Sequence, residues 1–114
     1  MKHLRNKVSL IGRLGAEPEV TTLDQGRKMA RFSLAINTSY RDKSGSFTKD
    51  VQWHTVNAWG TQADLVAKLL QKGQEIMIEG RLMNRTYETK TGEKRYATNI
   101  DLTEFLLIDS TKKD

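Results

Sequence analysis

The sequence contains no cysteine, one proline and two histidines among its 114 residues. A chain without cysteine has no disulfide framework, no thiol nucleophile and no cysteine-based zinc site. It is compatible with a reducing compartment such as the cytoplasm. Stability must then come from an ordinary hydrophobic core, which a chain of this length can form.

Long apolar runs are missing as well. No stretch approaches the ~20 residues that a membrane-spanning helix needs, so we expect no membrane partner. The first seven residues are basic but no apolar segment follows them, so we expect no secretory signal. The length predicts one domain, which we place at residues 1–108, followed by a short polar tail at 109–114.

Residues that catalyse reactions or bind metals form no recognisable set. His3 and His54 have no metal-ligand spacing, and the phosphate-binding motif Gly-x-x-x-x-Gly-Lys-Ser/Thr is absent. Asp42, Glu88 and Glu93 fall in or beside expected loops, where carboxylates are solvated, whereas a nuclease needs clustered carboxylates to hold metals. We therefore expect no enzyme activity, no catalytic residue, no metal and no cofactor.

Basic residues are in excess, and the net charge is +5. Residues 26–49 contain six Lys or Arg against Asp42 alone, a balance of +5, and residues 1–13 and 81–96 are also basic. If the fold joins these segments, they form a basic surface suited to phosphates; the alternative is a solvated surface that keeps the chain soluble. The candidate phosphate contacts are Arg31, Arg81, Arg85, Lys43, Lys49, Lys90 and Lys94.

Two tryptophans stand in the segment 53–59. In a strand, Trp53, Thr55, Asn57 and Trp59 share one face. The polar residues between the rings favour an accessible face, and exposed rings are costly unless something stacks on them. Nucleobases on a phosphate backbone fit such a basic, aromatic surface. The alternative is that both rings belong to the core.

Alternation and turn residues predict five strands and one helix. Leu65, Val66, Leu69 and Leu70 repeat at helical spacing. The order of three strands, one helix and two strands predicts an all-β, five-stranded OB-fold barrel with the helix between the third and fourth strands. Strands are expected over 7–14, 29–39, 51–59, 76–87 and 96–102, and the helix over 62–71.

The connections follow from the turn formers. Gly12 and Gly15 indicate a bend near the end of the first strand. The polar stretch 41–49 is expected to be a long loop. Thr61 is expected to cap the helix and Gly73 to end it.

Alternation also assigns faces to the last two strands. Ile76, Ile78, Gly80 and Leu82 are expected to face inward, and so are Tyr96, Thr98, Ile100 and Leu102. Alternation stops over residues 105–108, which predicts an end that is buried on both sides or packed against another chain.

Several short motifs occur in one order from about residue 6 to about residue 108. They are NKV at 6–8, GRLG at 12–15, PEV at 18–20, FSLA at 32–35, WHTV at 53–56, KG at 72–73, IEGRL at 78–82 and RYAT at 95–98. This set resembles bacterial single-stranded-DNA-binding proteins, the SSB family. The resemblance implies a cytoplasmic, nucleoid-associated homotetramer that wraps single-stranded DNA and protects it during replication, recombination and repair.

The resemblance also implies roles for individual residues. Four aromatic positions of the family, on which bases stack, correspond to Tyr40, Trp53, Trp59 and Tyr87, and a histidine at a subunit interface corresponds to His54. Tyr40 and Tyr87 stand where the best-known members have tryptophan, and Trp59 stands where the family often has phenylalanine.

The resemblance does not extend to the C-terminus. Family members usually continue into a flexible Gly/Pro/Gln-rich segment with an acidic tip that recruits replication and repair proteins, whereas this sequence ends in Lys112-Lys113-Asp114. Recruitment of such partners is therefore not expected. Two alternatives share the aromatic residues and the basic face: a primosome-type dimer and an RNA-binding OB-fold protein.

Overall fold

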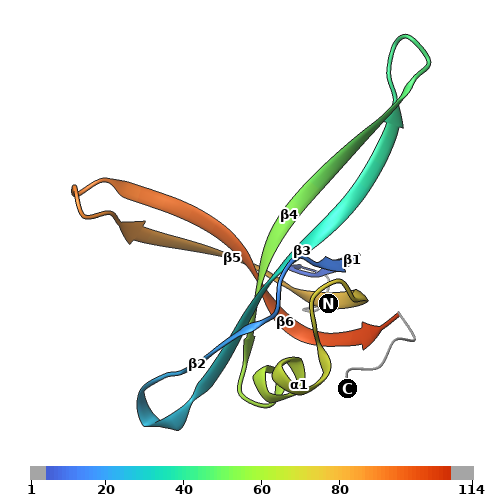
Figure 1. Cartoon of the computed structure of the whole chain (residues 1–114). Helices are drawn as coiled ribbons and strands as arrows, with labels where there is room; N and C mark the ends of the chain where they lie inside the picture. The colour runs from blue at the N-terminus through green and yellow to red at the C-terminus, as the bar shows by residue number, and fades with distance from the viewer. Residues whose placement is uncertain (1–4, 109–114) are drawn as a thin grey trace.

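Six β-strands and one α-helix follow one another in the computed structural model, which describes residues 5–108 (Figure 1). The predicted polar tail at 109–114 and His3 lie outside the described residues. The elements are β1 Val8–Leu14, β2 Glu19–Thr22, β3 Lys28–Arg41, β4 Phe47–Trp59, α1 Thr61–Leu69, β5 Glu75–Glu88 and β6 Lys94–Leu107.

The five long strands close into a barrel. The sheet order is β1-β5-β6-β4-β3-β2, and an additional pairing of β1 with β3 closes the ring. β4 and β6 run parallel, while the other pairs are antiparallel. α1 lies between the third and fourth strands of the barrel, so the predicted OB-fold arrangement is confirmed. β2 adds a short strand that, in the described part of the chain, pairs with β3 alone.

β1 changes its partner at the predicted bend. Its residues from Val8 to Arg13 pair with β5, and Arg13 and Leu14 pair with β3. A Cβ on Gly12 would lie 2.5 Å from the carbonyl oxygen of Ala35. Because a real Cβ does not approach a backbone oxygen so closely, the pairing of β1 with β3 needs glycine at this position.

The core fills the barrel and the space under α1. Alternating residues of β3 and β4 face inward, as predicted, because only one face of each strand is covered. Val66 of the helix and Leu70 just after it close one end. The buried apolar residues are Leu14, Ala30, Phe32, Leu34, Val56, Ala58, Ala63, Val66, Leu70, Ile76, Ile78, Ile100 and Leu102.

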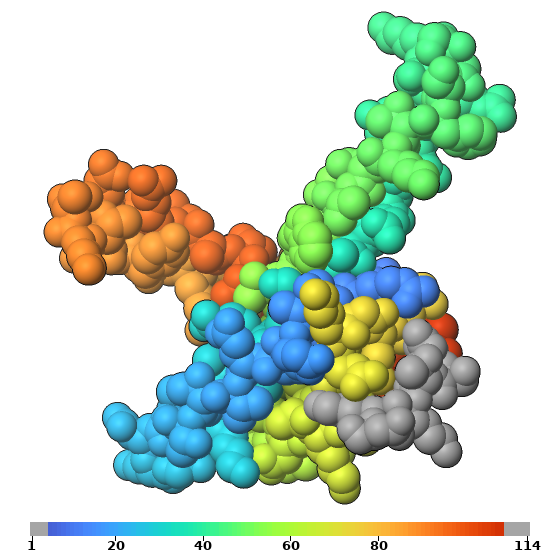
Figure 2. Space-filling view, in the orientation of Figure 1, coloured from blue at the N-terminus to red at the C-terminus, as the bar shows by residue number. Residues whose placement is uncertain are grey.

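Two hairpin arms extend from the barrel (Figures 1 and 2). Arm 1 is the outer part of β3 and β4, paired as far as Arg41 and Phe47; arm 2 is the outer part of β5 and β6, paired as far as Glu88 and Lys94. The predicted loop at 41–49 is therefore wrong, since only residues 42–46 leave the ladder. Both faces of a two-stranded ribbon are in water, so its strands need no alternation of apolar and polar residues. The sequence of such strands therefore resembles that of a polar loop.

The tips of the two arms have the same backbone design. Each five-residue loop, 42–46 and 89–93, has its first residue's N–H bonded to the carbonyl of the fifth. The fourth residue of each, Gly45 or Gly92, has positive φ, +87° and +84°, and donates its N–H to the carbonyl of the first. Glycine takes this conformation without steric strain.

Asp42 organises the tip of arm 1. Its carboxylate accepts hydrogen bonds from the Ser44 hydroxyl at 2.6 Å and from the backbone N–H groups of Ser44 and Ser46. The bond from the Ser44 hydroxyl is the main reason why the pKa of Asp42 lies below its ordinary value. This acid therefore stabilises the turn at the tip of arm 1.

The helix differs from the prediction at its ends. Gly60 occupies the N-cap with φ +58°, and no side chain caps α1, so the prediction of Thr61 as the cap is wrong. The helix ends at Leu69, before the expected 71, because Leu70 is extended. Gly73 has φ +87° and lies in the turn that follows.

Some residues predicted to face inward are exposed. Tyr96 and Thr98 are exposed because they lie in arm 2, and Leu82 is exposed because β5 continues past Gly80, the last of its residues that pairs with β1. Ile100 and Leu102 are buried, as predicted. Residues 106–108 are exposed in the single chain, so the option that this end is buried on both sides within one barrel is wrong.

Candidate nucleic-acid interface

Trp53 and Trp59 share the outer face of β4, which we call the tryptophan face. The side chains are 60% and 36% exposed, and their register partners on β3 are Ala35 and Met29. The predicted exposure of both rings is confirmed, and the alternative that both belong to the core is wrong. Two flat apolar surfaces are therefore available on one side of the barrel.

Trp53 lies directly against Gly15. A Cβ on Gly15 would be 2.5 Å from Cζ3 of the Trp53 ring and 2.8 Å from Cη2. Any larger residue at this position would displace the ring. The glycine that the sequence indicated as a bend thus also sets the position of the tryptophan.

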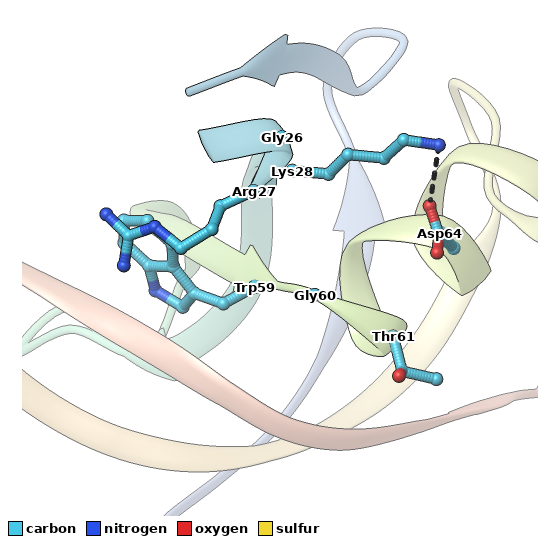
Figure 3. A pocket seen from close by; sticks show the side chains of 7 residues that line it. All are labelled: Gly26, Arg27, Lys28, Trp59, Gly60, Thr61 and Asp64. Atoms are coloured by element: carbon cyan, nitrogen blue, oxygen red, sulfur yellow. Dashed lines mark ion pairs between the residues drawn. The ribbon is translucent and has the colours of Figure 1, made fainter. Parts of the chain in front are cut away.

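Trp59 borders a hollow of about 580 Å³ at the end of the barrel next to α1 (Figure 3). The Arg27 side chain lies beside the indole ring, while Lys28 points away and pairs with Asp64, Nζ to Oδ1 3.2 Å. Arg27 was not among the predicted contacts, although it belongs to the basic segment 26–49. The hollow is lined by Gly26, Arg27, Lys28, Trp59, Gly60, Thr61 and Asp64.

A row of polar residues crosses the sheet between the two tryptophans. Arg31 of β3 pairs in register with Asn57 of β4, Asn57 with Asp101 of β6, and Asp101 with Arg81 of β5. Arg31 Nε donates to Asn57 Oδ1 at 3.2 Å. Asn57 is only 2% exposed, so this bond satisfies a buried amide oxygen.

The two predicted arginines of β5 differ in their surroundings. Arg85 Nη2 lies 3.2 and 3.4 Å from the carboxylate oxygens of Asp101, and the two side chains are 43% and 13% exposed. Arg81 is exposed and has no ion pair within residues 5–108. Of the two, Arg81 is the one whose charge is not already neutralised.

The two predicted tyrosines lie on different arms. Tyr87 shares a face of β5 with Arg81 and Arg85, as the alternation predicted. Tyr40 falls on the face of β3 opposite to Arg31, so only the twist of arm 1 can turn its ring toward the tryptophan face. Both tyrosines are exposed.

The four predicted lysines are divided between the arms. Lys43 is in the tip of arm 1 and Lys49 is in its β4 strand, while Lys90 is in the tip of arm 2 and Lys94 begins β6. All four are exposed, and in the described part of the chain none forms an ion pair. The basic charge therefore extends from the barrel along both arms.

Two exposed aromatic residues of the arms were missed as stacking candidates. Tyr96 in arm 2 is 79% exposed, although alternation placed it inward, and Phe47 lies in the stretch predicted to be a loop. The Arg41 guanidinium is 5.0 Å from the centroid of the Phe47 ring. Each residue is an aromatic close to the turn of a basic hairpin, and this pattern could have identified both as stacking candidates.

His54 lies on the inner side of β4, opposite Leu34 in register, and is half-buried. This agrees with its predicted inward direction. Its role at a subunit interface stays a prediction.

Two other kinds of site have no counterpart among residues 5–108. No group of three or more His, Cys, Asp and Glu side chains there is close enough to share a metal ion. In the same range, α1 is too short and too polar to cross a membrane.

Comparison with known proteins identifies the family. Residues 5–108 match the model of the single-strand binding protein family. Single-stranded DNA-binding protein 1 of Chlorobaculum tepidum is 40% identical over 104 residues, which is 90% of this chain and 64% of that protein. The chain therefore spans just under two thirds of the length of this relative.

Solved structures with the same fold agree. A Plasmodium falciparum SSB in complex with ssDNA matches with a TM-score of 0.85 and 32% identity, covering 96% of this chain and 99% of that one. A deletion mutant of the single-stranded DNA binding protein from Thermus aquaticus matches with a TM-score of 0.82 and 30% identity, covering 96% and 53%. On its sequence and its fold, this chain belongs to the single-strand binding protein family.

Proposed function

We propose that the chain binds single-stranded DNA with little base preference and protects it during replication, recombination and repair. The observation that carries this proposal is the tryptophan face, where two exposed indole rings flank a row that contains Arg31 and Arg81. Bases stack on such rings with about 1–3 kcal/mol each, whatever their identity. Lys and Arg neutralise the phosphates.

A binding role without catalysis is part of this proposal, and the proposed place of action is the cytoplasmic nucleoid. Stacking requires bases that are free of a complementary strand. Base-specific readout of a duplex requires a helix or ribbon in the major groove, and the proposed contacts instead lie on a sheet face and on the arms. The chain should therefore discriminate between single-stranded and double-stranded DNA more strongly than between different bases.

Fluorescence anisotropy with labelled oligo-dT, a mixed-sequence single strand, the matching duplex and an RNA strand tests this function. We expect both DNA single strands to bind at least about tenfold more tightly than the duplex, which is the equivalent of one stacked base or ~1.4 kcal/mol. Addition of magnesium should leave the labelled strand intact. Equal affinity for the duplex would contradict the proposal, and tighter binding of RNA would favour the RNA-binding alternative.

We further propose that the chain assembles as a homotetramer; the number four comes from the family resemblance. An apolar row, which we call the outer apolar row, supports self-association: Ile11, Met77 and Leu106 occupy paired positions on β1, β5 and β6, and all three are exposed. Within residues 5–108, positions 8–12 of β1 pair only with β5, so in this part of the chain the strand has an edge that a second copy can pair with.

Replacement of Met77 by lysine should reduce the assembly, because a charge in a contact between apolar faces is strongly unfavourable. Sedimentation at micromolar protein should give four times the chain mass for the wild type and a smaller mass for the variant. Leu82→Lys is the matched control, since it places the same charge at another exposed apolar residue of β5. A wild-type monomer at every concentration would contradict the proposal, and a stable dimer would favour the primosome-type alternative.

A further inference from the structure

We propose that Asp101 is a counter-ion built into the DNA-binding face, which keeps Arg85 from acting as an independent phosphate contact. This inference rests on the proposed function. It concerns how much of the DNA affinity of this face comes from base stacking and how much from ion pairs with phosphates. Asp101 was not among the predicted site residues. Register between four strands and one ion pair place it there.

Asp101 lies in the middle of the face. It pairs in register with Asn57, which stands on β4 between the two tryptophans, and with Arg81 on its other side. Its carboxylate accepts both hydrogen bonds of Arg85 Nη2. A negative charge therefore sits among the arginines that were expected to neutralise phosphates.

The surroundings of Asp101 make this pairing durable. Its side chain is 13% exposed, and a carboxylate with so little access to water is unfavourable unless a cation and hydrogen bonds compensate it. A phosphate that takes Arg85 would leave this carboxylate unpaired beside a second anion. Arg85 therefore stays with Asp101, while Arg81 is free to meet the DNA backbone.

The consequence for DNA binding is that contacts with phosphates contribute a smaller part of the binding free energy. On single strands, the slope of log affinity against log salt is about −0.7 for each phosphate neutralised. Arg81 should contribute to that slope and Arg85 should not. Stacking then carries more of the affinity, and a duplex, which offers phosphates but no free bases, is disfavoured. Asp101 thus acts as a determinant of single-strand selectivity.

Asp101→Asn tests the proposal, because it removes the charge and keeps the shape. Binding of oligo-dT and of the matching duplex is measured by anisotropy over a range of salt concentrations. We expect the oligo-dT slope to steepen by up to about 0.7 and the low-salt affinity to rise roughly twofold to fivefold. Duplex affinity should rise by a larger factor, so the preference for the single strand should fall; an unchanged preference would refute the role of Asp101 in selectivity.

Glu104→Gln is the matched control for net charge. Glu104 is an exposed carboxylate on the same strand, β6, and its replacement changes the net charge by the same amount. It should leave the slope unchanged. Equal effects of the two substitutions would mean that only net charge matters, and that would overturn the proposal.

Alanine substitutions at the two arginines give a second test. In the wild-type background, Arg81→Ala should flatten the slope by about 0.7, whereas removal of the whole ion pair by Arg85→Ala together with Asp101→Asn should leave the slope unchanged. Compared with Asp101→Asn alone, the double variant should therefore have a slope that is flatter by up to about 0.7. Equal flattening by Arg81→Ala and by the double variant, each compared with the wild type, would show that Arg85 already contacts phosphate and would refute the counter-ion. Wild-type protein that does not bind oligo-dT at all would instead refute the proposed function.

Discussion

Replacing Trp53 by alanine should weaken oligo-dT binding by roughly 1–3 kcal/mol while leaving the fold intact, and Trp59→Ala should have an effect of the same size. Both side chains expose a large part of their surface, so their loss removes a base-stacking surface and little core packing. Anisotropy titration measures the affinity, and circular dichroism with thermal melting measures the fold. Because the two rings are the only indoles of the chain, the intrinsic fluorescence of the wild type should fall on DNA binding.

The control for this experiment is Val51→Ala. Val51 is exposed and stands on the same face of β4 as Trp53, but it has no aromatic ring on which a base can stack. Its replacement should change affinity by much less than that of either tryptophan. If Trp53→Ala unfolds the protein, and if DNA does not change the wild-type fluorescence, the rings are structural and the stacking mechanism fails.

Gly80→Ala should lower the free energy of unfolding by about 1–3 kcal/mol. Gly80 is buried where the β5–β6 register shifts. A Cβ there would collide with the carbonyl oxygen of Asp101 and would lie 2.8 Å from Cγ2 of Ile100. The two strands would have to separate at the bulge between Glu79 and Gly80. Urea denaturation at a fixed protein concentration measures the change, since assembly makes stability depend on concentration.

Thr86→Ala is the comparison for Gly80→Ala. Thr86 is exposed on the same strand, and a surface substitution of this kind changes stability by less than about 0.5 kcal/mol. Unchanged stability of Gly80→Ala would mean that the bulge between β5 and β6 opens without strain. In that case the glycine would have no packing role at this position.

The barrel could be predicted because its strands have one buried and one solvated face. Ala30, Phe32 and Leu34 alternate with polar residues, and that period determines both the strand and its inward side. The same reasoning located Trp53 and Trp59. The single change of period between residues 60 and 73 was enough to place the helix and, with it, the OB-fold.

The arms and the central ion pair could not be predicted in the same way. Neither face of a two-stranded ribbon is buried, so the alternation at Tyr96 and Thr98 does not identify a buried face. The contact between Arg85 and Asp101 joins residues 16 positions apart on two strands, and their register is continuous from Glu88–Lys94 to Gly80–Leu102. Alternation within one strand predicts which side chains share a face, but it does not predict which residues of two strands are paired. The burial of Asn57 likewise depends on which strand β4 meets in the barrel.

The proposed DNA-binding surface has two parts that differ in local stability: the barrel and the two arms. Beyond the barrel, the described backbone of each arm pairs only with its own hairpin partner, and a lone two-stranded ribbon is marginally stable. Arm amides should therefore exchange their hydrogens through local opening, well before the amides of the barrel. Under the proposed function, a nucleotide bound at Trp53 meets a preorganised ring, whereas one bound at Tyr40 or Tyr87 must also order a ribbon and loses conformational entropy. Affinity should thus rise steeply with strand length until the barrel is covered, and more gradually along the arms.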